Sequence, residues 1–398
     1  MSSAAQQNTA QPTIARRPMR ARSTRHIPTV LVWQIVAVTV LMLLATRSWW
    51  GLGGAAVVLL LAILLSVPVN GRSLWATLRV HRRFIARRQH RVEAPDLPSE
   101  LVPLGQWLPR LQVTQTKSAA GGEIGVVADG NSWAALLELT SDDVLIVDHG
   151  AELNLESLGD LIQQDDVVFA GIQVVTLTVP APTQAMLTPD SPAMVSYLEI
   201  VGADATPPAV RRTWITLRLD PKLCLEAVDR RGSGLAGVLA TLRFGLHRAQ
   251  ATLKRQGVAT RALDPIAIAE VLSLASGAAP QHEGERTRET WRQWSCDSLV
   301  HETRTISSFG SDPTANYQAL LDAAAQCPAM MVLTSFTLSP GQSARGAVRH
   351  VCHNEEQAAA ADEELIPELS GRLSFGPLGG VQVPGMLATV PLGRQVES

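Results

Sequence analysis

A glycine-rich run offers the most specific chemistry in the sequence. Residues Gly232 to Gly237 read G-S-G-L-A-G and match the G-x-G-x-x-G spacing that places a pyrophosphate at a helix N-terminus. A dinucleotide site also needs a strand directly before the motif and an acid about 20 residues after it. Residues 223–231 are instead charged and read as helix or loop, and Asp264 comes too late. We therefore interpret the run as a break between two helices.

Two acidic clusters are candidates for binding a divalent cation. Asp142-Asp143 lie close to Asp148, and Asp165-Asp166 form a second pair. Metal-dependent glycosyl transfer commonly uses an Asp-x-Asp spacing, which the sequence lacks, so solvated turns at strand ends are the favoured interpretation. The sequence also contains no P-loop and no G-x-S-x-G elbow, so we expect neither nucleotide hydrolysis nor serine hydrolase chemistry.

A third cluster contains nitrogen and sulfur ligands. His350, Cys352 and His353 stand together, and alternation along a strand would put the first two on one face. A structural zinc site needs four ligands, and Cys327 is a speculative third. We disfavour a zinc site because further ligands at matching spacing are missing, so the sequence predicts no catalytic residue, no cofactor and no metal.

Paired arginines and tryptophans have structural explanations as well. The Arg pairs 211–212 and 230–231 favour salt bridges over phosphate binding. Trp291 and Trp294 are three residues apart, which on a predicted helix favours core packing over a partner-binding patch.

Two segments near the N-terminus, residues 27–46 and 48–71, contain no charged residue. A helix of about 20 residues crosses a bilayer, so we predict a transmembrane hairpin with spans 27–46 and 50–69. Arg47, Trp49 and Trp50 lie at its turn, where Trp suits the polar–apolar boundary. A cleaved signal peptide is disfavoured because no small-residue cleavage site follows Ala45. Buried core helices are disfavoured because they normally carry a polar stripe.

Charge is divided unevenly along the chain and predicts the orientation of the hairpin. Residues 1–95 contain 13 Arg and one acid, Glu93, and so carry +12; residues 96–398 contain 21 bases and 35 acids and carry −14. Arginines flank both spans on their outer sides, so the positive-inside rule places both termini in the cytoplasm, at the inner membrane. The acidic remainder excludes a uniformly basic nucleic-acid binder. Four scattered cysteines suit reduced thiols rather than a disulfide framework.

Residues 72–95 read as a basic helix and linker next to the membrane. We predict that Arg79, Arg82, Arg83 and Arg87 contact lipid head groups or a partner, as do the tryptophans of the turn. Leu74, Leu78 and Ile85 share another face, although the amphipathic pattern is only moderate. A solvated basic flank is the alternative.

Residues 96–398 alternate between strand and helix patterns, without a fixed-period repeat. Residues 211–219 are the clearest strand, and Asp264-Pro265 and Asp312-Pro313 are caps that open helices. The other predicted strands are 133–139, 144–147, 171–179, 301–309, 329–338 and 344–351, and the other predicted helices are 153–163, 193–200, 235–256 and 355–369. The predicted fold is therefore a membrane-anchored, mixed α/β domain in one or two lobes, preceded by a disordered basic tail over 1–26.

One stretch resembles a known family. Val195-Ser196-Tyr197, Gly202, Pro207-Pro208 and the run from Arg211 to Pro221, R-R-T-W-I-T-L-R-L-D-P, are similar to the EccE family of type VII (ESX) secretion components in mycobacteria. The double span with its basic flank is similar too. The resemblance implies a non-catalytic inner-membrane subunit that assembles with EccB, EccC and EccD components, of which EccC supplies the ATPase. A membrane-anchored α/β enzyme, such as a glycosyltransferase, is the alternative.

Overall fold

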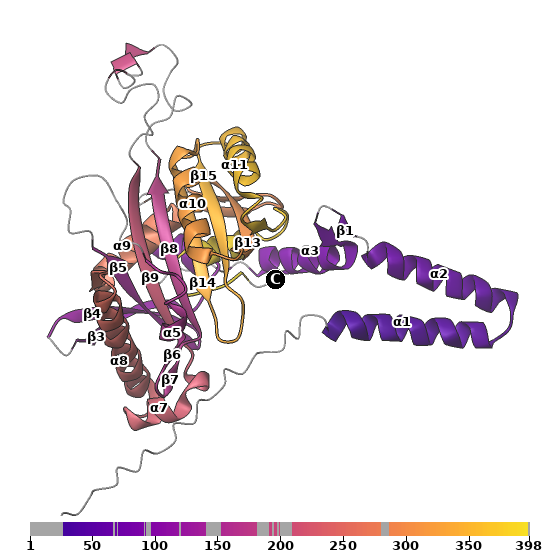
Figure 1. The fold of residues 1–398 in the computed structure, drawn as a ribbon, viewed down its shortest axis with the longest axis horizontal. Coiled ribbons are helices and arrows are strands. Elements are labelled where there is room, and N and C mark those ends of the chain that lie inside the picture. Colours follow the sequence, from indigo (N-terminus) through magenta and orange to yellow (C-terminus); the bar gives the residue numbers. More distant parts are fainter. Residues whose placement is uncertain are drawn as a thin grey trace, which may run out of the picture.

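The structure is a computed structural model that describes residues 27–66, 68–69, 71–90, 92, 97–118, 121–140, 153–180, 191–192, 195–196, 199, 209–279 and 286–396. Figure 1 shows three parts in sequence: a helical hairpin, a connecting helix and an α/β domain. The predicted tail over 1–26 and the predicted strand 144–147 lie outside the described residues, as does most of the predicted helix 193–200.

The hairpin consists of α1 (Ile27–Ala45) and α2 (Trp49–Ser66), which pack against each other. Close packing at the turn depends on Gly51, because a Cβ there would lie 2.4 Å from the Leu43 carbonyl oxygen. Ala55, one turn further along α2, is buried. Most other large side chains of the two helices are exposed, including Leu41 and Met42 at 65% and 71%. Over the residues that the structure describes, no helix reaches the length and apolarity needed to cross a membrane.

After α2, a two-residue pair of strands, β1 (Pro68–Val69) and β2 (Arg72–Ser73), leads into α3 (Leu74–Gln89). The Ser73 hydroxyl accepts a hydrogen bond from the backbone N–H of Ala76 and so caps the helix. In Figure 1 α3 lies between the hairpin and the α/β domain and runs on from α2 toward the domain.

The α/β domain is built on one antiparallel sheet of twelve strands among the described residues. Ten of them follow the order β11-β12-β13-β15-β14-β8-β9-β5-β4-β3, while β10 pairs with β5 and β16 pairs with β13. The strands are β3 (Leu111–Lys117), β4 (Glu123–Asp129), β5 (Ser132–Leu139), β8 (Gly171–Val179), β9 (Val210–Leu219), β10 (Thr260–Ala262), β11 (Thr287–Glu289), β12 (Trp294–Cys296), β13 (Leu299–Ser308), β14 (Met331–Leu338), β15 (Arg345–Cys352) and β16 (Ser374–Phe375). A separate small pair is formed by β6 (Gln163–Gln164) and β7 (Val167–Val168).

The order of this sheet repeats. The first half contains β3, β4, β5, β8, β9 and β10. Strands β3, β4 and β5 form a meander, and β5 also pairs with β9 of the β8–β9 hairpin and with the short strand β10. The second half (β11 to β16) has the same order, and the halves meet at the antiparallel β8–β14 pair, where Val175 lies opposite Ser335. A two-fold rotation about an axis perpendicular to the sheet at this pair relates the two orders. One continuous sheet therefore joins two units of like topology.

Helices cover both faces of the sheet. The α8 face carries α8 (Gly234–Arg255), α10 (Pro313–Gln326) and α11 (Glu355–Leu369). The α9 face carries α4 (Val102–Gly105), α9 (Pro265–Ser276) and α12 (Gln382–Thr389). The remaining helical turns are α5 (Gly159–Ile162), α7 (Leu225–Arg230) and the 3₁₀ turns η2 (Ser99–Leu101) and η3 (Pro221–Leu223).

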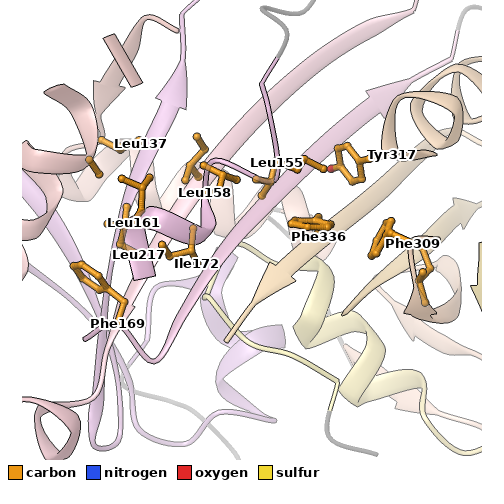
Figure 2. Close-up of a cluster of buried hydrophobic side chains, with 14 of the residues drawn as sticks. Leu137, Leu155, Leu158, Leu161, Phe169, Ile172, Leu217, Phe309, Tyr317 and Phe336 are labelled. Atoms are coloured by element: carbon orange, nitrogen blue, oxygen red, sulfur yellow. The ribbon is translucent and has the colours of Figure 1, made fainter. Parts of the chain in front are cut away.

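The core on the α8 face runs across both halves. Figure 2 shows Leu158 and Ile172 of the first half close to Leu155, with Tyr317, Phe336 and Phe309 of the second half continuing the cluster. The Phe309 and Phe336 rings lie 4.9 Å apart and edge to face, a geometry that adds to the burial energy. The shared core makes the two halves one folding unit.

Several sequence predictions are confirmed. The strand predicted at 211–219 is β9, which pairs with β8 on one side and β5 on the other, and its Trp214 is fully buried. Asp264 accepts a hydrogen bond from Ala267 N–H at 2.9 Å, and Asp312 one from Ala315 N–H at 3.0 Å, so both predicted caps exist.

Two predictions of local structure are wrong, and some elements were not predicted at all. Of the helix predicted at 153–163 only the short α5 is present. Leu155 and Leu158 lie in turns, and their side chains are buried there and not on one face of a helix. Trp291 lies in a bend and Trp294 in β12, so they do not share a helix. Strands β3 and β4 and helix α12 were not predicted.

Candidate membrane and assembly interface

The tip of the hairpin exposes the two tryptophans singled out from the sequence. Trp49 is 88% and Trp50 is 92% exposed at the start of α2. Arg47 precedes them with a positive φ of 48°, which sharpens the turn. The tip thus presents two aromatic rings and one cation, a combination suited to an interface between water and an apolar phase.

The basic helix α3 presents three of its four predicted contact arginines to solvent. Arg79, Arg82 and Arg83 are exposed, and the Arg79 guanidinium lies 6.0 Å from the centre of the Trp75 ring. Leu78 and Ile85, two of the three apolar residues expected to share another face of this helix, are 50% and 41% exposed. Both sets of side chains are available to a contact outside this chain.

The fourth arginine binds within the chain. Arg87 donates to both carboxylate oxygens of Glu289, from Nη2 at 2.9 Å and from Nε at 3.3 Å, and also to the Gly380 carbonyl at 2.8 Å. The Glu289 side chain is fully buried and accepts a further hydrogen bond from Val383 N–H. Glu289 therefore joins α3, β11 and α12 at one point. A buried acid with several donors holds its partners firmly, since removing any of them leaves charge unpaired.

An aromatic cluster reinforces this junction. The buried Phe84 ring of α3 meets Trp291 edge to face at 5.5 Å, and His81 lies 5.5 Å from the same indole. Gly379 and Gly380 make room for the indole, because a Cβ on either would lie within 2.5 Å of it. The absence of side chains at these two glycines is thus required for α3 to dock.

The start of α3 is held by Arg72. Its guanidinium donates to the carbonyls of Gly379 at 2.6 Å and Pro377 at 3.1 Å. Burial lowers the pKa of Arg72 from its ordinary value. Carbonyl dipoles bind the cation without neutralising it, so the positive charge remains available to an anion.

A groove of about 800 Å³ opens between α3 and the loop before α12. Its polar wall contains Arg72, Arg292 and Arg304, and no carboxylate is among its lining residues. Arg304 is held by Asp362, Nε to Oδ1 at 2.8 Å and Nη2 to Oδ2 at 2.6 Å. Its apolar wall is formed by residues of α3, α11 and the following loop: Leu74, Ile366, Leu373, Phe375 and Leu378.

The strand that carries Arg304, β13, also carries one of two buried titratable groups that lie opposite each other in the sheet. Glu302 of β13 pairs in register with His350 of β15, and both are buried. Burial raises the pKa of Glu302 to about 7, with the Asp362 charge acting in the same direction. Burial lowers the pKa of His350 to about 4, so this imidazole is neutral at pH 7.

The residues considered for metal or cofactor chemistry are placed as follows. His350 and Cys352 do share a face of β15, and all four cysteines are buried free thiols. Asp142, Asp143 and Asp148 lie outside the described residues. Within the described segments no group of three or more His, Cys, Asp or Glu is arranged to hold a metal ion.

The remaining candidates have structural roles. The glycine run separates α7 from α8, with positive φ at Gly232 and Gly234, so the predicted break between helices is confirmed. Asp166 binds Arg230 and Arg231, so this Arg pair forms salt bridges as predicted.

Sequence reasoning missed the residues that fix α3 to the domain. Glu289 is 202 positions from Arg87, a separation across which no local pattern links an acid to a base. One signal was available: adjacent Gly379-Gly380 in a loop indicates a close backbone approach, although the sequence does not say to what.

The described residues therefore define a class of protein: an exposed apolar hairpin fixed, through a basic helix, to a mixed α/β domain with a large antiparallel sheet. Residues 207–306, from three residues before β9 into β13, match the model of the EccE family, described as a type VII ESX secretion system translocon. The resemblance inferred from the run at Arg211 to Pro221 is thereby confirmed.

Curated relatives agree with the family match. The chain is 27% identical over 260 residues to the ESX-1 secretion system protein EccE1 of Mycobacterium tuberculosis, covering 61% of this chain and 49% of that protein. It is 29% identical over 231 residues to the protein of the same name from Mycolicibacterium smegmatis, covering 54% of this chain and 42% of that one. The chain thus spans about half the length of these relatives. Their names describe a secretion component and not an enzyme.

Proposed function

We propose that this chain is a non-catalytic structural subunit of a type VII secretion complex, anchored in the inner membrane and assembling with EccB-, EccC- and EccD-type partners. One structural observation supports a structural role most directly: α3 is fixed to the domain by Arg87–Glu289, Arg72 and the Phe84–Trp291 contact. The hairpin and the sheet are therefore held together, as a subunit that links a membrane to partners outside it requires.

The hairpin inserts into the membrane in this proposal. Its two helices carry no charged residue between Ile27 and Ala45 or between Trp49 and Ser66, and their large side chains are mostly exposed. Exposed apolar surface of this extent is costly in water and favourable in lipid. At 1.5 Å per residue α1 and α2 rise about 27–29 Å, slightly less than the roughly 30 Å hydrocarbon layer. Experiment must therefore distinguish a hairpin that crosses the bilayer from one that enters partway.

The direction of α3 divides its arginines between two contacts. Because α3 runs on from α2 in Figure 1, its residues move away from the membrane by about 1.5 Å each. Arg82 and Arg83 then lie about 12 Å beyond the start of the helix, further than the roughly 8 Å over which charges act at physiological salt. In the proposal they bind an acidic partner surface, while Arg79 lies nearer the head groups.

Topology is tested by labelling intact cells with a membrane-impermeant thiol reagent. The four native cysteines are buried, so an added cysteine dominates the signal. Ser48→Cys should be labelled from outside, and Ser2→Cys and Ser398→Cys only after the cells are opened. Labelling of position 2 or 398 in intact cells would contradict the orientation, and protection of position 48 would mean that the hairpin does not cross.

Assembly is tested by co-purification from detergent-solubilised membranes. The triple variant Arg79→Glu, Arg82→Glu and Arg83→Glu should recover about tenfold less of the partner subunits, since each surface charge contributes up to about 1 kcal/mol. The control variant Arg110→Glu, Arg255→Glu and Arg288→Glu changes the net charge equally at exposed positions outside α3. Equal recovery with both triple variants would show that α3 is only a solvated flank.

A further inference from the structure

The groove between α3 and the loop before α12 combines two features. One wall carries three arginines with no carboxylate among the lining residues, and the other wall is apolar. We propose that this groove binds the phosphorylated head group of an anionic phospholipid, with the glycerol and the first carbons of an acyl chain against the apolar wall.

The charge in the groove favours an anion. Arg72 is bound only by backbone carbonyls, and Arg292 is exposed and makes no ion pair within the described part of the chain. Arg304 is held in place by Asp362, which compensates its charge, so the net positive charge of the groove comes from Arg72 and Arg292. Guanidinium groups donate two parallel hydrogen bonds to a phosphate, which makes arginine the suitable residue for such a ligand.

The apolar wall and the position of the groove favour a lipid over a soluble phosphate. Leu74, Ile366 and Phe375 line the groove and are partly exposed, so they would face water around a small anion but would be covered by an acyl chain. Arg72 follows the end of α2 at Ser66 by six residues, so the groove opens where the apolar hairpin meets the domain. The inference that the ligand comes from a membrane rests on the proposed membrane insertion, whereas the charge and shape of the groove do not depend on it.

Native mass spectrometry of the full chain in non-ionic detergent tests the proposal and does not require the hairpin to have inserted. The chain is titrated with dioctanoyl phosphatidylglycerol, dioctanoyl phosphatidylcholine and glycerol phosphate. We expect phosphatidylglycerol to bind at least tenfold more tightly than the other two. Arg292→Glu should weaken that binding about tenfold, since it replaces a charged donor with a repelling group.

Two further variants separate the groove from general attraction. Arg288→Glu changes the net charge equally at an exposed position outside the groove and should leave binding unchanged. Ser370→Trp keeps the charge and fills the groove from the end of α11, so it should also weaken binding about tenfold. Equal binding of phosphatidylcholine, full competition by glycerol phosphate, or the same affinity in Arg292→Glu and Arg288→Glu would each overturn the proposal. Failed labelling at position 48 would overturn only the membrane insertion.

Discussion

The two halves of the sheet share one strand order but differ in what they carry. In the first half the outer strands β3 and β4 are seven residues each, and α9 packs against them. In the second half the outer strands β11 and β12 are three residues each, and α3 is joined to β11 through Glu289 and contacts Trp291 in the β11–β12 turn. The short strands β11 and β12 therefore lie where α3 contacts the domain.

The two halves of the sheet therefore differ in what they bind, although they share one topology. The second half holds α3, the groove and, through them, the hairpin. The first half presents exposed apolar residues around α7 and the start of α8: Leu223, Leu225 and Leu235. A shared core lets changes in one half affect the stability of both, whereas attachment of α3 should depend on the second half alone.

The largest expected effect tests the core on the α9 face, which also contains residues of both halves. Trp214 is fully buried in β9 of the first half, with Arg212 5.3 Å from its ring centre. Trp214→Ala should lower the free energy of unfolding by about 3–5 kcal/mol, because it leaves a large cavity. Denaturant unfolding of the full chain in detergent, followed by a separate signal from each half, measures this change in the free energy of unfolding. If only the first half melts earlier, the two halves do not form one folding unit.

The second prediction separates attachment of α3 from general stability. Glu289→Ala leaves Arg87 without its acid and should cost about 3 kcal/mol, at the lower end for a buried pair because Arg87 is 23% exposed. Amide exchange in α3 should then rise strongly, as the helix detaches.

Glu138→Ala provides the matched control in the first half. Glu138 is nearly buried and binds two arginines, Arg212 and Arg261, each at 2.6 Å. Its loss should destabilise the domain and leave the exchange of α3 amides unchanged under native conditions. Equal loss of α3 protection in both variants would show that α3 attachment is not a property of the second half.

Local chemistry explains which elements the sequence predicts. Asp264 and Asp312 cap their helices through contacts three residues away, and β9 alternates in its own residues, so both kinds of element are readable. In contrast α12 contains Pro384 and Gly385 and forms because the sheet buries it. The repeat of strand order is invisible because the connections differ in length: residues 180–209 link β8 to β9, whereas the six residues 339–344 link β14 to β15.

The candidate site, like the fold, contains parts that the sequence predicts and parts that it does not. The hairpin and its basic flank follow from hydropathy and charge, which need no tertiary contact to be recognised. The groove and the Arg87–Glu289 pair bring together residues about 200 to 300 positions apart, and their formation depends on the whole sheet. Trp291 was misassigned for this reason, since its spacing from Trp294 fits a helix and its partner is α3.

A third prediction concerns pH and the second half. Glu302 has a folded pKa of about 7, above its unfolded value, so its protonated form stabilises the fold below about pH 4.5 and this contribution is lost as pH rises through 7. Asp362 opposes its ionisation, and Arg292 and Arg304 favour it. Between pH 5 and 8 the wild-type chain should lose about 2 kcal/mol relative to Glu302→Gln. Parallel pH profiles of the two proteins would contradict the assignment.

The smallest effect concerns the first half and has the opposite sign. Asp166 accepts hydrogen bonds from Arg231 at 2.7 and 2.8 Å and from Arg230 at 2.7 Å, and the Arg231 hydrogen bonds lower its pKa to about 2. A depressed folded pKa stabilises the protein above the unfolded value near 4, and that contribution is lost as pH falls toward 2.

Asp166→Asn should therefore cost about 1 kcal/mol at pH 7, a value reduced for solvent screening because the Asp166 side chain is 23% exposed. Near pH 2 most of this difference should be lost, because the carboxyl is then about half protonated in the folded wild-type chain and almost fully protonated in the unfolded one. Unfolding of both proteins at pH 7, 4 and 2.5, beside Glu302→Gln, compares the two halves directly: acid should weaken the Asp166 contribution and strengthen that of Glu302. A difference between Asp166→Asn and the wild-type chain that stays constant from pH 7 to 2.5 would show that packing around Arg231, and not its charge, accounts for the effect.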